Sequence, residues 1–313
     1  MLHNFLFVLI NGLVYGLLLF LLSSGLTLIF SMMGVLNFAQ ASFYMIGAYM
    51  GYQLMAWTNF WVALVIAPIF VGILGALIER YILSRVHKRG HIAELLLTFG
   101  LSYLIIEVIK LIWGVDAVSY NLPRALNFPL FTVGGISYPA YNIFMMAVSV
   151  VIFIMLFLLL KKTRIGIIIQ AALTHRDMVS MLGHNIPRVF ALVFGIGCAL
   201  AGVAGVVGGN MLVTEPSMAL SIGPIIFVVV VVGGMGSFGG ALAASLLIGF
   251  LQNYMTTVNL SLVGLFGLTA WPHMPFYDLF SQPVSELAPI MPYFLMILIL
   301  ICRPKGLMGR VEI

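Results

Sequence analysis

The stretch VVVVVGGMGSFGGALAASLLIGFLQNY, residues 228–254, places a glycine-rich break inside an otherwise apolar part of the chain. A run of valines leads into GGMGSFGG at 233–240, and an apolar segment rich in small residues follows. Glycine adopts backbone conformations that other residues avoid, and it lets neighbouring chains approach closely. Whether this break is a turn inside a membrane depends on the rest of the sequence.

The composition is that of an integral membrane protein. Of the 313 residues, 63% are hydrophobic and 7% are charged, and the mean hydropathy is +1.18. In soluble domains about a quarter of the residues are charged. A β-barrel is disfavoured, because barrels alternate apolar and polar residues in short strands, whereas residues 141–160 are almost entirely apolar. We therefore predict an all-α polytopic helix bundle, with residues 1–313 forming one transmembrane domain.

A hydrocarbon core takes about 20 apolar residues per helix, so the chain has room for roughly eight to nine spans. The candidate spans are 6–30, 36–55, 61–82, 93–113, 139–160, 189–210, 222–233, 239–257 and 287–302. The first apolar run has no basic residue before it and is longer than the core of a signal peptide. We expect it to be retained as the first helix.

The distribution of charge predicts the orientation in the membrane. The basic clusters are Arg80, Arg85, Lys88 and Arg89, then Lys161, Lys162, Arg164, Arg176 and Arg188, and finally Arg303, Lys305 and Arg310. The positive-inside rule places all of them in the cytoplasm. Segments 114–139 and 259–286 contain Arg124 as their only Lys or Arg and are predicted to face outward. The N-terminus is then outward and the C-terminus cytoplasmic. The net charge of +5 lies in loops of this kind, so we predict no nucleic-acid binding.

This orientation requires the glycine break. A single helix over 222–257 would put the tail after Cys302 on the same side as Asn259, against its positive charge. Two membrane-embedded arms joined at 233–240 return the tail to the cytoplasm. Broken backbone in a bilayer is tolerated only where protein or a water-filled cavity satisfies its polar groups. The break is therefore either a tight helical hairpin or part of a solute route, for which Gly233, Gly234 and Gly236 are the candidate residues.

Uncharged polar residues raise the same choice near the N-terminus. Asn37, Gln40 and Ser42 lie within an otherwise apolar stretch. Burying such groups is costly unless they find hydrogen-bond partners. They either join helices to one another or line a hydrated route for a polar solute.

No motif for catalysis or nucleotide binding is present. No glycine loop fits the Walker A pattern, because the cluster at 233–240 contains no lysine. His87 and His91 have a spacing that suits zinc, but Gly90 interrupts the helix and the nearest further ligand is Glu94, so we interpret this region as a charged loop. We predict no metal site, no cofactor in this chain and no enzymatic activity.

Other potentially reactive groups have ordinary explanations. Cys198 and Cys302 lie in apolar segments, so we expect unpaired, inert core thiols and no disulfide. The ionisable residues Glu79, Glu94, Glu107 and Lys110 lie near the ends of spans, where we expect an interfacial location. A charge at mid-bilayer would suggest an ion relay. Its absence counts against an ion-driven transporter.

One soluble segment interrupts the spans, KKTRIGIIIQAALTHRDMVSMLGHNIPRVFALVFG at 161–195. A basic anchor leads into a mixed stretch at 166–182, with Gly183 as the expected helix stop and Pro187 at the start of the next span. We predict a short cytoplasmic helix that exposes Arg176 and Asp177. By composition it is either a handle for a partner protein or an amphipathic helix at the membrane interface.

Several motifs in order carry a resemblance to a known family. They are LNFAQASFYMIGAY at 36–49, LGHN at 182–185, FGIGCALAGVAGVVGG at 194–209, GGMGSFGGALAASLLIG at 233–249 and CRPKGLMG at 302–309. Together they resemble the branched-chain amino-acid permeases of bacterial ABC importers, most closely the LivH-type subunit. The resemblance covers the chain from its first helix to about residue 258, and also the tail.

The resemblance implies an importer of several subunits in the bacterial inner membrane. The partners would be a second, LivM-like permease, two ATP-binding subunits that hold ATP and Mg, an extracytoplasmic solute-binding protein and the membrane lipid. It also implies that segment 166–188 is the coupling segment that contacts an ATP-binding subunit. The candidate coupling residues are Arg176, Asp177, Met178, Gly183, His184 and Asn185.

The sequence departs from the family pattern in ways that leave the solute open. Relatives usually carry N-F-A-H-G where this chain has Asn37-Phe38-Ala39-Gln40-Ala41, and Ser180 and Met181 make the coupling segment bulkier. Residues 259–286 match no pattern of the family, and Trp271 and Tyr277 there suit either the outer membrane interface or a receptor contact. Branched-chain or other hydrophobic amino acids are the first expectation. A permease for urea or short amides and an ion-coupled secondary amino-acid transporter are the alternatives.

Overall fold

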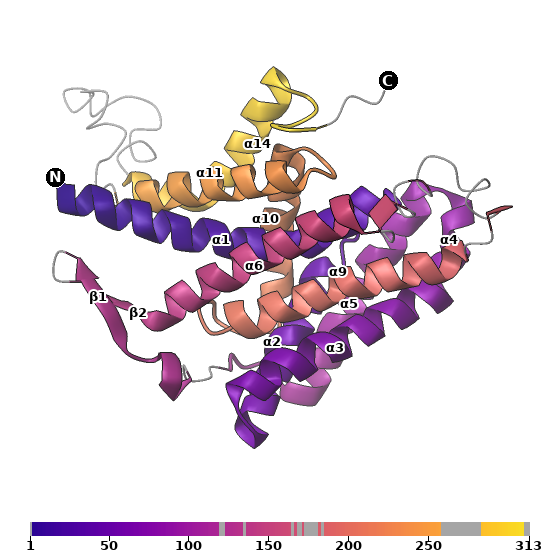
Figure 1. The fold of residues 1–313 in the computed structure, drawn as a ribbon, viewed down its shortest axis with the longest axis horizontal. Coiled ribbons are helices and arrows are strands. Elements are labelled where there is room, and N and C mark those ends of the chain that lie inside the picture. The colour runs from indigo at the N-terminus through magenta and orange to yellow at the C-terminus, as the bar shows by residue number, and fades with distance from the viewer. Residues whose placement is uncertain are drawn as a thin grey trace, which may run out of the picture.

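The computed structural model describes residues 2–118, 123–133, 136–163, 166–167, 171, 181–182, 185–257 and 283–309. Long helices dominate this part of the chain (Figure 1). The helices are α1 (Leu2–Met33), α2 (Gln40–Trp57), α3 (Phe60–Ile78), α4 (Ser84–Val86), α5 (His91–Trp113), α6 (Ala140–Lys162), α9 (Ile186–Gly208), α10 (Met218–Gly233), α11 (Phe238–Thr257) and α14 (Met291–Cys302). Shorter turns are η1 (Glu79–Leu83), η2 (His87–Arg89), η3 (Arg124–Leu126) and η5 (Val284–Ile290).

The predicted helical membrane bundle is confirmed. Seven helices in the described part of the chain are long and apolar enough to cross a membrane. They lie at Val8–Met33, Phe60–Val86, His91–Trp113, Ala140–Lys162, Ile186–Gly208, Phe238–Thr257 and Ser285–Cys302. Helices α2 and α10 are not among these seven, but they pack among them and bury much of their surface, and α10 crosses the others steeply in Figure 1. With these two, the described helices agree with the predicted eight to nine spans.

Helix α9 is the centre of the bundle. It packs against α1, α2 and α3, and small residues bring the backbones close together. A Cβ on Gly205 would lie 2.3 Å from the carbonyl oxygen of Tyr44 in α2, and one on Gly202 would lie 2.9 Å from the Cα of Pro68 in α3. Lipid tails are as apolar as leucine, so close packing of this kind is what holds membrane helices together. The motif at 194–209 is therefore a packing surface.

The helices around α9 bring the basic residues to one end of the bundle. Helix α1 is antiparallel to α9, since Leu18 lies near Gly208 and Ile29 near Gly197. Helices α3 and α6 run in the same direction as α1, so their C-terminal ends and the first turn of α9 lie together (Figure 1). The described basic residues in the segments at these helix ends are Arg80, Arg85, Lys88, Arg89, Lys161, Lys162 and Arg188.

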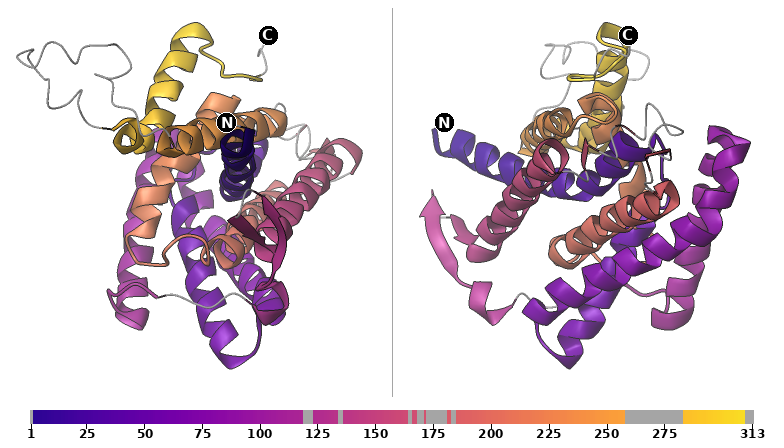
Figure 2. Two further views of the ribbon diagram at one scale, coloured as in Figure 1. Left: turned by 90° about the vertical axis from the view of Figure 1, so that its left-hand side faces the viewer. Right: turned by 45° about the vertical axis from the view of Figure 1, so that its right-hand side comes forward.

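The opposite end carries the connections predicted to face outward. The 114–139 connection contains a hairpin that the sequence analysis did not predict, in which β1 (Pro129–Val133) pairs antiparallel with β2 (Ile136–Pro139). The ribbon of the hairpin stands beside the start of α6 in both views of Figure 2. Most of the 259–286 connection, including Trp271 and Tyr277, lies outside the described residues.

The two cysteines differ in their surroundings. Cys198 is buried in α9, as expected, whereas Cys302 is exposed at the end of α14. The expectation of a core thiol was therefore wrong for Cys302, because the last turn of α14 lies at the edge of the bundle, with few neighbours to cover it.

We predict that Gly205→Ala destabilises the fold. The new methyl group would meet the backbone of α2 at 2.3 Å, an overpacking that costs on the order of 1–3 kcal/mol or more. Gly100→Ala is the matched control, because a Cβ at Gly100 meets nothing within 4 Å. The thermal midpoint of the detergent-solubilised protein should fall for Gly205→Ala and stay level or rise for Gly100→Ala. Equal midpoints in both variants would contradict the close packing of α9 on α2.

Candidate functional site

The polar residues near the N-terminus lie where the chain leaves α1 and enters α2. Asn37 and Gln40 are buried, and their amide groups are hydrogen-bonded. The Asn37 Oδ1 accepts from the backbone N–H of Ala39 at 3.0 Å, and the Asn37 Nδ2 donates to the Gln40 Oε1 at 3.4 Å. The Gln40 Nε2 donates to the carbonyl of Gly197 in α9 at 3.0 Å. These contacts fix the start of α2 to the central helix.

Two further contacts tie the same segment to α5. The hydroxyls of Ser42 and Ser102 lie 2.8 Å apart, and the backbone N–H of Phe38 donates to the Oγ1 of Thr98 at 3.3 Å. Thus Gln40 and Ser42 each join two helices, which fits the first of the two roles that the sequence left open, whereas the bonds of Asn37 are local and order the start of α2. Their part in a solute route stays a prediction.

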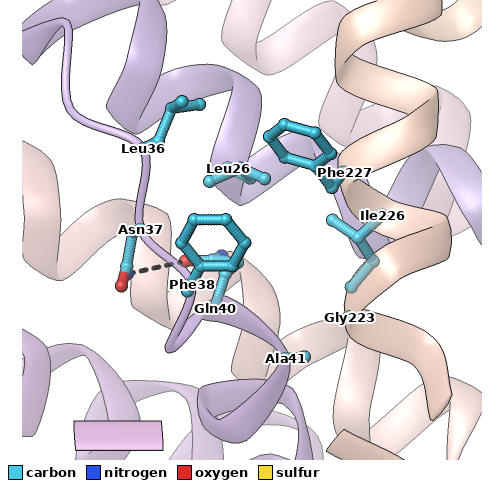
Figure 3. A pocket seen from close by; sticks show the side chains of 9 residues that line it. All are labelled: Leu26, Leu36, Asn37, Phe38, Gln40, Ala41, Gly223, Ile226 and Phe227. Atoms are coloured by element: carbon cyan, nitrogen blue, oxygen red, sulfur yellow. Dashed lines mark hydrogen bonds between the residues drawn. The ribbon is translucent and has the colours of Figure 1, made fainter. Parts of the chain in front are cut away.

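A narrow pocket adjoins this segment (Figure 3). Side chains from α1, from the 36–41 segment and from α10 surround it. They are Leu26, Leu36, Asn37, Phe38, Gln40, Ala41, Gly223, Ile226 and Phe227. Phe38 stacks on Phe227 with ring centroids 5.7 Å apart and an interplanar angle of 21°. The structure therefore brings Asn37 and Gln40 to one pocket, while Ser42 is not among the lining residues.

The aromatic pair in this pocket was not predicted from the sequence. Phe38 was part of a quoted motif, and Phe227 stood in an apolar run with no distinguishing neighbour. The sequence signal closest to this pair is Gly223-Pro224, which predicts an irregular point in α10 about one turn before Phe227. Pairing across 189 positions of chain depends on the packing of α10 against α2.

The glycine break is a turn between α10 and α11, and it lies away from the pocket. Gly234 and Gly236 have φ angles of +95° and +86°, which favour glycine. A Cβ on Gly233 would lie 2.6 Å from the backbone nitrogen of Ala241, so the two helices meet here without side chains between them. Gly236 lies beside Ser31, near the end of α1 where the basic residues gather.

The C-terminal tail binds this turn. The backbone N–H groups of Leu307 and Met308 donate to the carbonyls of Val232 at 2.8 Å and Gly233 at 3.0 Å. The last carbonyls of any helix lack partners within the helix. Here the backbone N–H groups of the tail are the partners of these carbonyls, so the tail caps α10. The tail therefore lies at the same end of the bundle as the glycine turn.

Most of the predicted coupling residues lie outside the described part of the chain. These are Arg176, Asp177, Met178, Gly183 and His184. Asn185 is described, and it caps α9 by accepting a hydrogen bond from the backbone N–H of Arg188 at 3.2 Å. The neighbouring Met181 and Leu182 are 86% and 76% exposed, so they present apolar side chains at the basic end.

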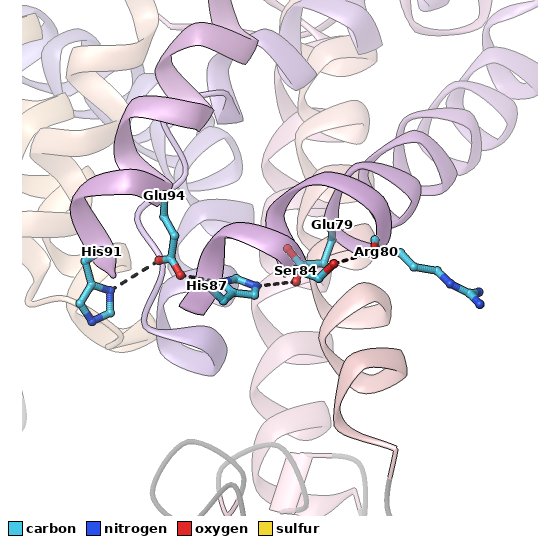
Figure 4. A network of polar contacts seen from close by, with 6 residues as sticks. All are labelled: Glu79, Arg80, Ser84, His87, His91 and Glu94. Carbon is cyan, nitrogen blue, oxygen red and sulfur yellow. Dashed lines mark hydrogen bonds and ion pairs between the residues drawn. The ribbon is translucent and has the colours of Figure 1, made fainter. Parts of the chain in front are cut away.

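An ionic cluster that the sequence analysis did not predict lies at this end (Figure 4). The Nε2 of His87 lies 2.8 Å from Glu79 and its Nδ1 lies 2.6 Å from Glu94. The exposed fraction is 1% for Glu79, 5% for Glu94 and 10% for the His87 side chain. The sequence predicted a charged loop here, with both carboxylates near the ends of spans. The carboxylates do lie next to the end of α3 and in the first turn of α5, but the three groups are folded inward and buried, which the sequence did not indicate. His91 lies 3.5 Å from Glu94 and is 82% exposed.

The His87 cluster joins the end of α3 to the first turn of α5. Both ring nitrogens face carboxylate oxygens, an arrangement that suits a doubly protonated imidazole. Burial by itself lowers the pKa of His87, but the hydrogen bonds and charges of Glu79 and Glu94 outweigh it and raise the pKa above its usual range. Glu94 lies in the first turn of α5, where the helix dipole favours a negative charge.

Comparison with known proteins agrees with this architecture. Residues 8–300 match the family model described as the permease component of the branched-chain amino acid transport system. The chain belongs to this permease family. The earlier resemblance to it is thereby confirmed. As a member, the permease is a multi-pass membrane subunit of a transport system and not an enzyme.

Individual relatives of the permease cover nearly the whole chain. The high-affinity branched-chain amino acid permease LivH of Salmonella typhimurium is 27% identical, with 97% of this chain and 95% of the relative aligned. BraD of Pseudomonas aeruginosa is 26% identical over 99% and 98% of the two chains. A probable LivH of Methanocaldococcus jannaschii is 28% identical over 79% of each. No solved structure matches the permease significantly.

We predict that Gly234→Ala releases the tail of the permease. A Cβ there would lie 2.4 Å from the backbone nitrogen of Gly309, and the positive φ adds strain on the order of 1–3 kcal/mol. Limited trypsin digestion of the solubilised permease should cut faster after Lys305 than in wild type. Gly239→Ala is the control, since its Cβ would make an ordinary 3.5 Å contact with Met308. A wild-type cleavage rate in Gly234→Ala would argue against the docked tail.

We also predict that the stability of the permease depends on pH through His87. Because the folded-state pKa is raised, the stabilisation is complete below the ordinary pKa and is lost as pH rises through the folded value. The thermal midpoint should therefore decrease from pH 6 upward. His87→Ala should lower the midpoint at pH 6 and flatten this dependence, because two buried carboxylates lose their cation at a cost of about 3–5 kcal/mol. His91→Ala should behave as wild type, and a wild-type pH profile in His87→Ala would refute the role of the cluster.

Proposed function

We propose that this chain is the permease subunit of an ATP-driven importer for branched-chain or other hydrophobic amino acids, and that it forms half of the translocation route. The observation that carries the proposal is the family match over residues 8–300, together with relatives named as branched-chain amino acid permeases over nearly their full length. The helical membrane bundle and its small-residue packing are consistent with it.

The orientation follows from the charge at the two ends. Basic residues gather where α1, α3 and α6 end, and the tail with Arg303 and Lys305 docks at the same end. By the positive-inside rule this end faces the cytoplasm. The proposal therefore places the C-terminus in the cytoplasm, the N-terminus outside, and the chain in the inner membrane of a bacterium.

The driving energy comes from partner subunits in this proposal. Two ATP-binding subunits hold ATP and Mg, a second, LivM-like permease supplies the other half of the route, and an extracytoplasmic binding protein delivers the solute. Segment 166–188 is the proposed coupling segment. Its location is supported by the cytoplasmic assignment of its flanks, Lys162 at the end of α6 and Asn185 at the start of α9.

Asn37 and Gln40 are the proposed polar residues of the route, since both border the pocket beside α10. Ser42 acts one step away, by holding α2 to α5. The role proposed for the glycine turn is indirect. Together with the bound tail, Gly233, Gly234 and Gly236 fix the position of the end of α10, and α10 borders the route.

The apolar walls of the pocket favour an aliphatic amino acid over urea or a short amide, because a small polar solute gains nothing from leucine, isoleucine and phenylalanine. An ion-coupled mechanism would need a buried ionisable group, and the buried carboxylates among the described residues are Glu79 and Glu94. Both are paired with His87 at the basic end of the bundle, which suits a structural ion cluster better than an ion site at mid-membrane.

The first test is reconstitution of the complete importer in proteoliposomes. Concentrative uptake of labelled leucine, isoleucine or valine should require ATP, the binding protein and both permeases. This chain alone should accumulate nothing under a proton or sodium gradient. Uphill transport by the lone chain would contradict the proposal, and uptake of urea but not of leucine would favour the alternative solute.

The second test concerns the coupling segment. In the same complex, Arg176→Ala together with Asp177→Ala should strongly reduce the ATP hydrolysis that the loaded binding protein stimulates. Lys161→Ala, at the exposed end of α6, is the control and should leave it unchanged. Full stimulation in the double variant would reject this assignment.

A further inference from the structure

The aromatic pair Phe38 and Phe227 lies well inside the bundle. Phe38 is bonded through its backbone to Thr98, which lies seven residues into α5. With a helical rise of about 1.5 Å per residue, this is about 10 Å from the basic end of that helix. Phe38 is nevertheless 42% exposed. The stacked rings therefore lie about two helical turns from the basic end of α5 and line the pocket that Asn37 and Gln40 border (Figure 3).

One side of this pair is held rigidly. The segment that carries Phe38 is bonded to Thr98 through the backbone, and the Asn37 side chain bridges Ala39 and Gln40. Gln40 in turn binds the backbone of α9. Since these bonds connect Phe38 to α5 and α9, its ring forms a fixed wall.

The helix that carries Phe227, α10, contains a point at which it can bend. Phe227 lies three residues after Pro224, just under one helical turn, and proline removes one hydrogen bond from the interior of α10. Gly223, just before it, has no side chain, and a Cβ there would meet only Ala41, at 3.4 Å. The far end of α10 is bonded to the tail. The stretch from Pro224 to Gly234 is therefore an arm with a weak point at one end and a cytoplasmic attachment at the other.

We propose that Phe38 and Phe227 form an aromatic gate on the cytoplasmic half of the translocation route. Movement of the tail and of the α10 end bends the helix at Pro224 and separates the two rings. The structure described here has the gate closed. This inference rests on the proposed function, because it takes the pocket as part of the solute route.

The pocket has a free volume of about 10 Å³ in this closed arrangement, so a solute fits only after the rings separate, and the lining then suits an amino acid with an aliphatic side chain. Each of the amides of Asn37 and Gln40 has two N–H donors, and the described residues supply a partner for one of them. The remaining donors fit a solute carboxylate. Leu26, Leu36 and Ile226 provide an apolar wall for its side chain.

The gate is tested in the reconstituted importer with Phe38→Ala, Phe227→Ala and the double variant. Removing the rings should leave the gate open. Assembly and stimulated ATP hydrolysis should then stay intact, whereas steady-state leucine accumulation should fall several-fold and the ATP-independent efflux of preloaded leucine should become faster. Leu220→Ala is the matched control, because Leu220 is a similarly exposed residue of α10 that does not line the pocket. Wild-type accumulation and efflux in the double variant would overturn the gate.

A second measurement covers the case in which the alanine variants fail to assemble. Phe38→Cys and Phe227→Cys are combined in a Cys302→Ser background, since Cys302 is exposed and Cys198 is buried. Joining the two thiols with a short, reducible cross-linker should stop uptake, and a reductant should restore it, while either single cysteine variant continues to transport. Undiminished uptake by the cross-linked protein would overturn the gate. Absence of ATP-dependent uptake in the wild-type complex would instead refute the proposed function.

Discussion

The structure depends on one constraint, that backbone polar groups inside a membrane must find partners within the protein. The constraint is most severe where a helix stops. Between α1 and α2, side chains of Asn37 and Thr98 bind the exposed N–H groups of Ala39 and Phe38. At the glycine turn, the tail binds the last carbonyls of α10. Each interruption of helix thus creates a specific contact between distant parts of the chain, and the candidate route lies between the two interruptions.

Close packing of small residues is the second element of this design. Lipid removes most of the hydrophobic drive that holds soluble helices together, so contact depends on how closely the backbones approach. The glycines of α9 bring it against α1, α2 and α3, while Gly12 and Gly16 of α1 allow the same approach to α11. The result is a rigid centre. Helix α10 contains Pro224 and packs against α1, α2, α11 and α14.

Sequence reasoning worked best where a feature is local. The order of the spans, the glycine turn and the burial of Asn37 and Gln40 were all readable from runs of residues. It failed where partners are far apart in the chain. His87 was assigned to a charged loop because neither η1 nor η2 leaves a recognisable pattern, and the stacking of Phe38 on Phe227 joins the turn before α2 to α10, two segments with no shared motif.

The sequence alone determined that this protein is a helical membrane protein, because apolar length, charge asymmetry and glycine spacing report on the lipid environment and on the order of the elements. The permease family was indicated by the resemblance of its ordered motifs and confirmed by the family match. Only the tertiary structure decided which residues meet. The docking of the tail on Gly234, the burial of Glu79 and Glu94 around His87, and the aromatic pair at the pocket arise from the angles at which helices cross. Those angles depend on three-dimensional packing at many contacts at once, which no single segment of sequence encodes.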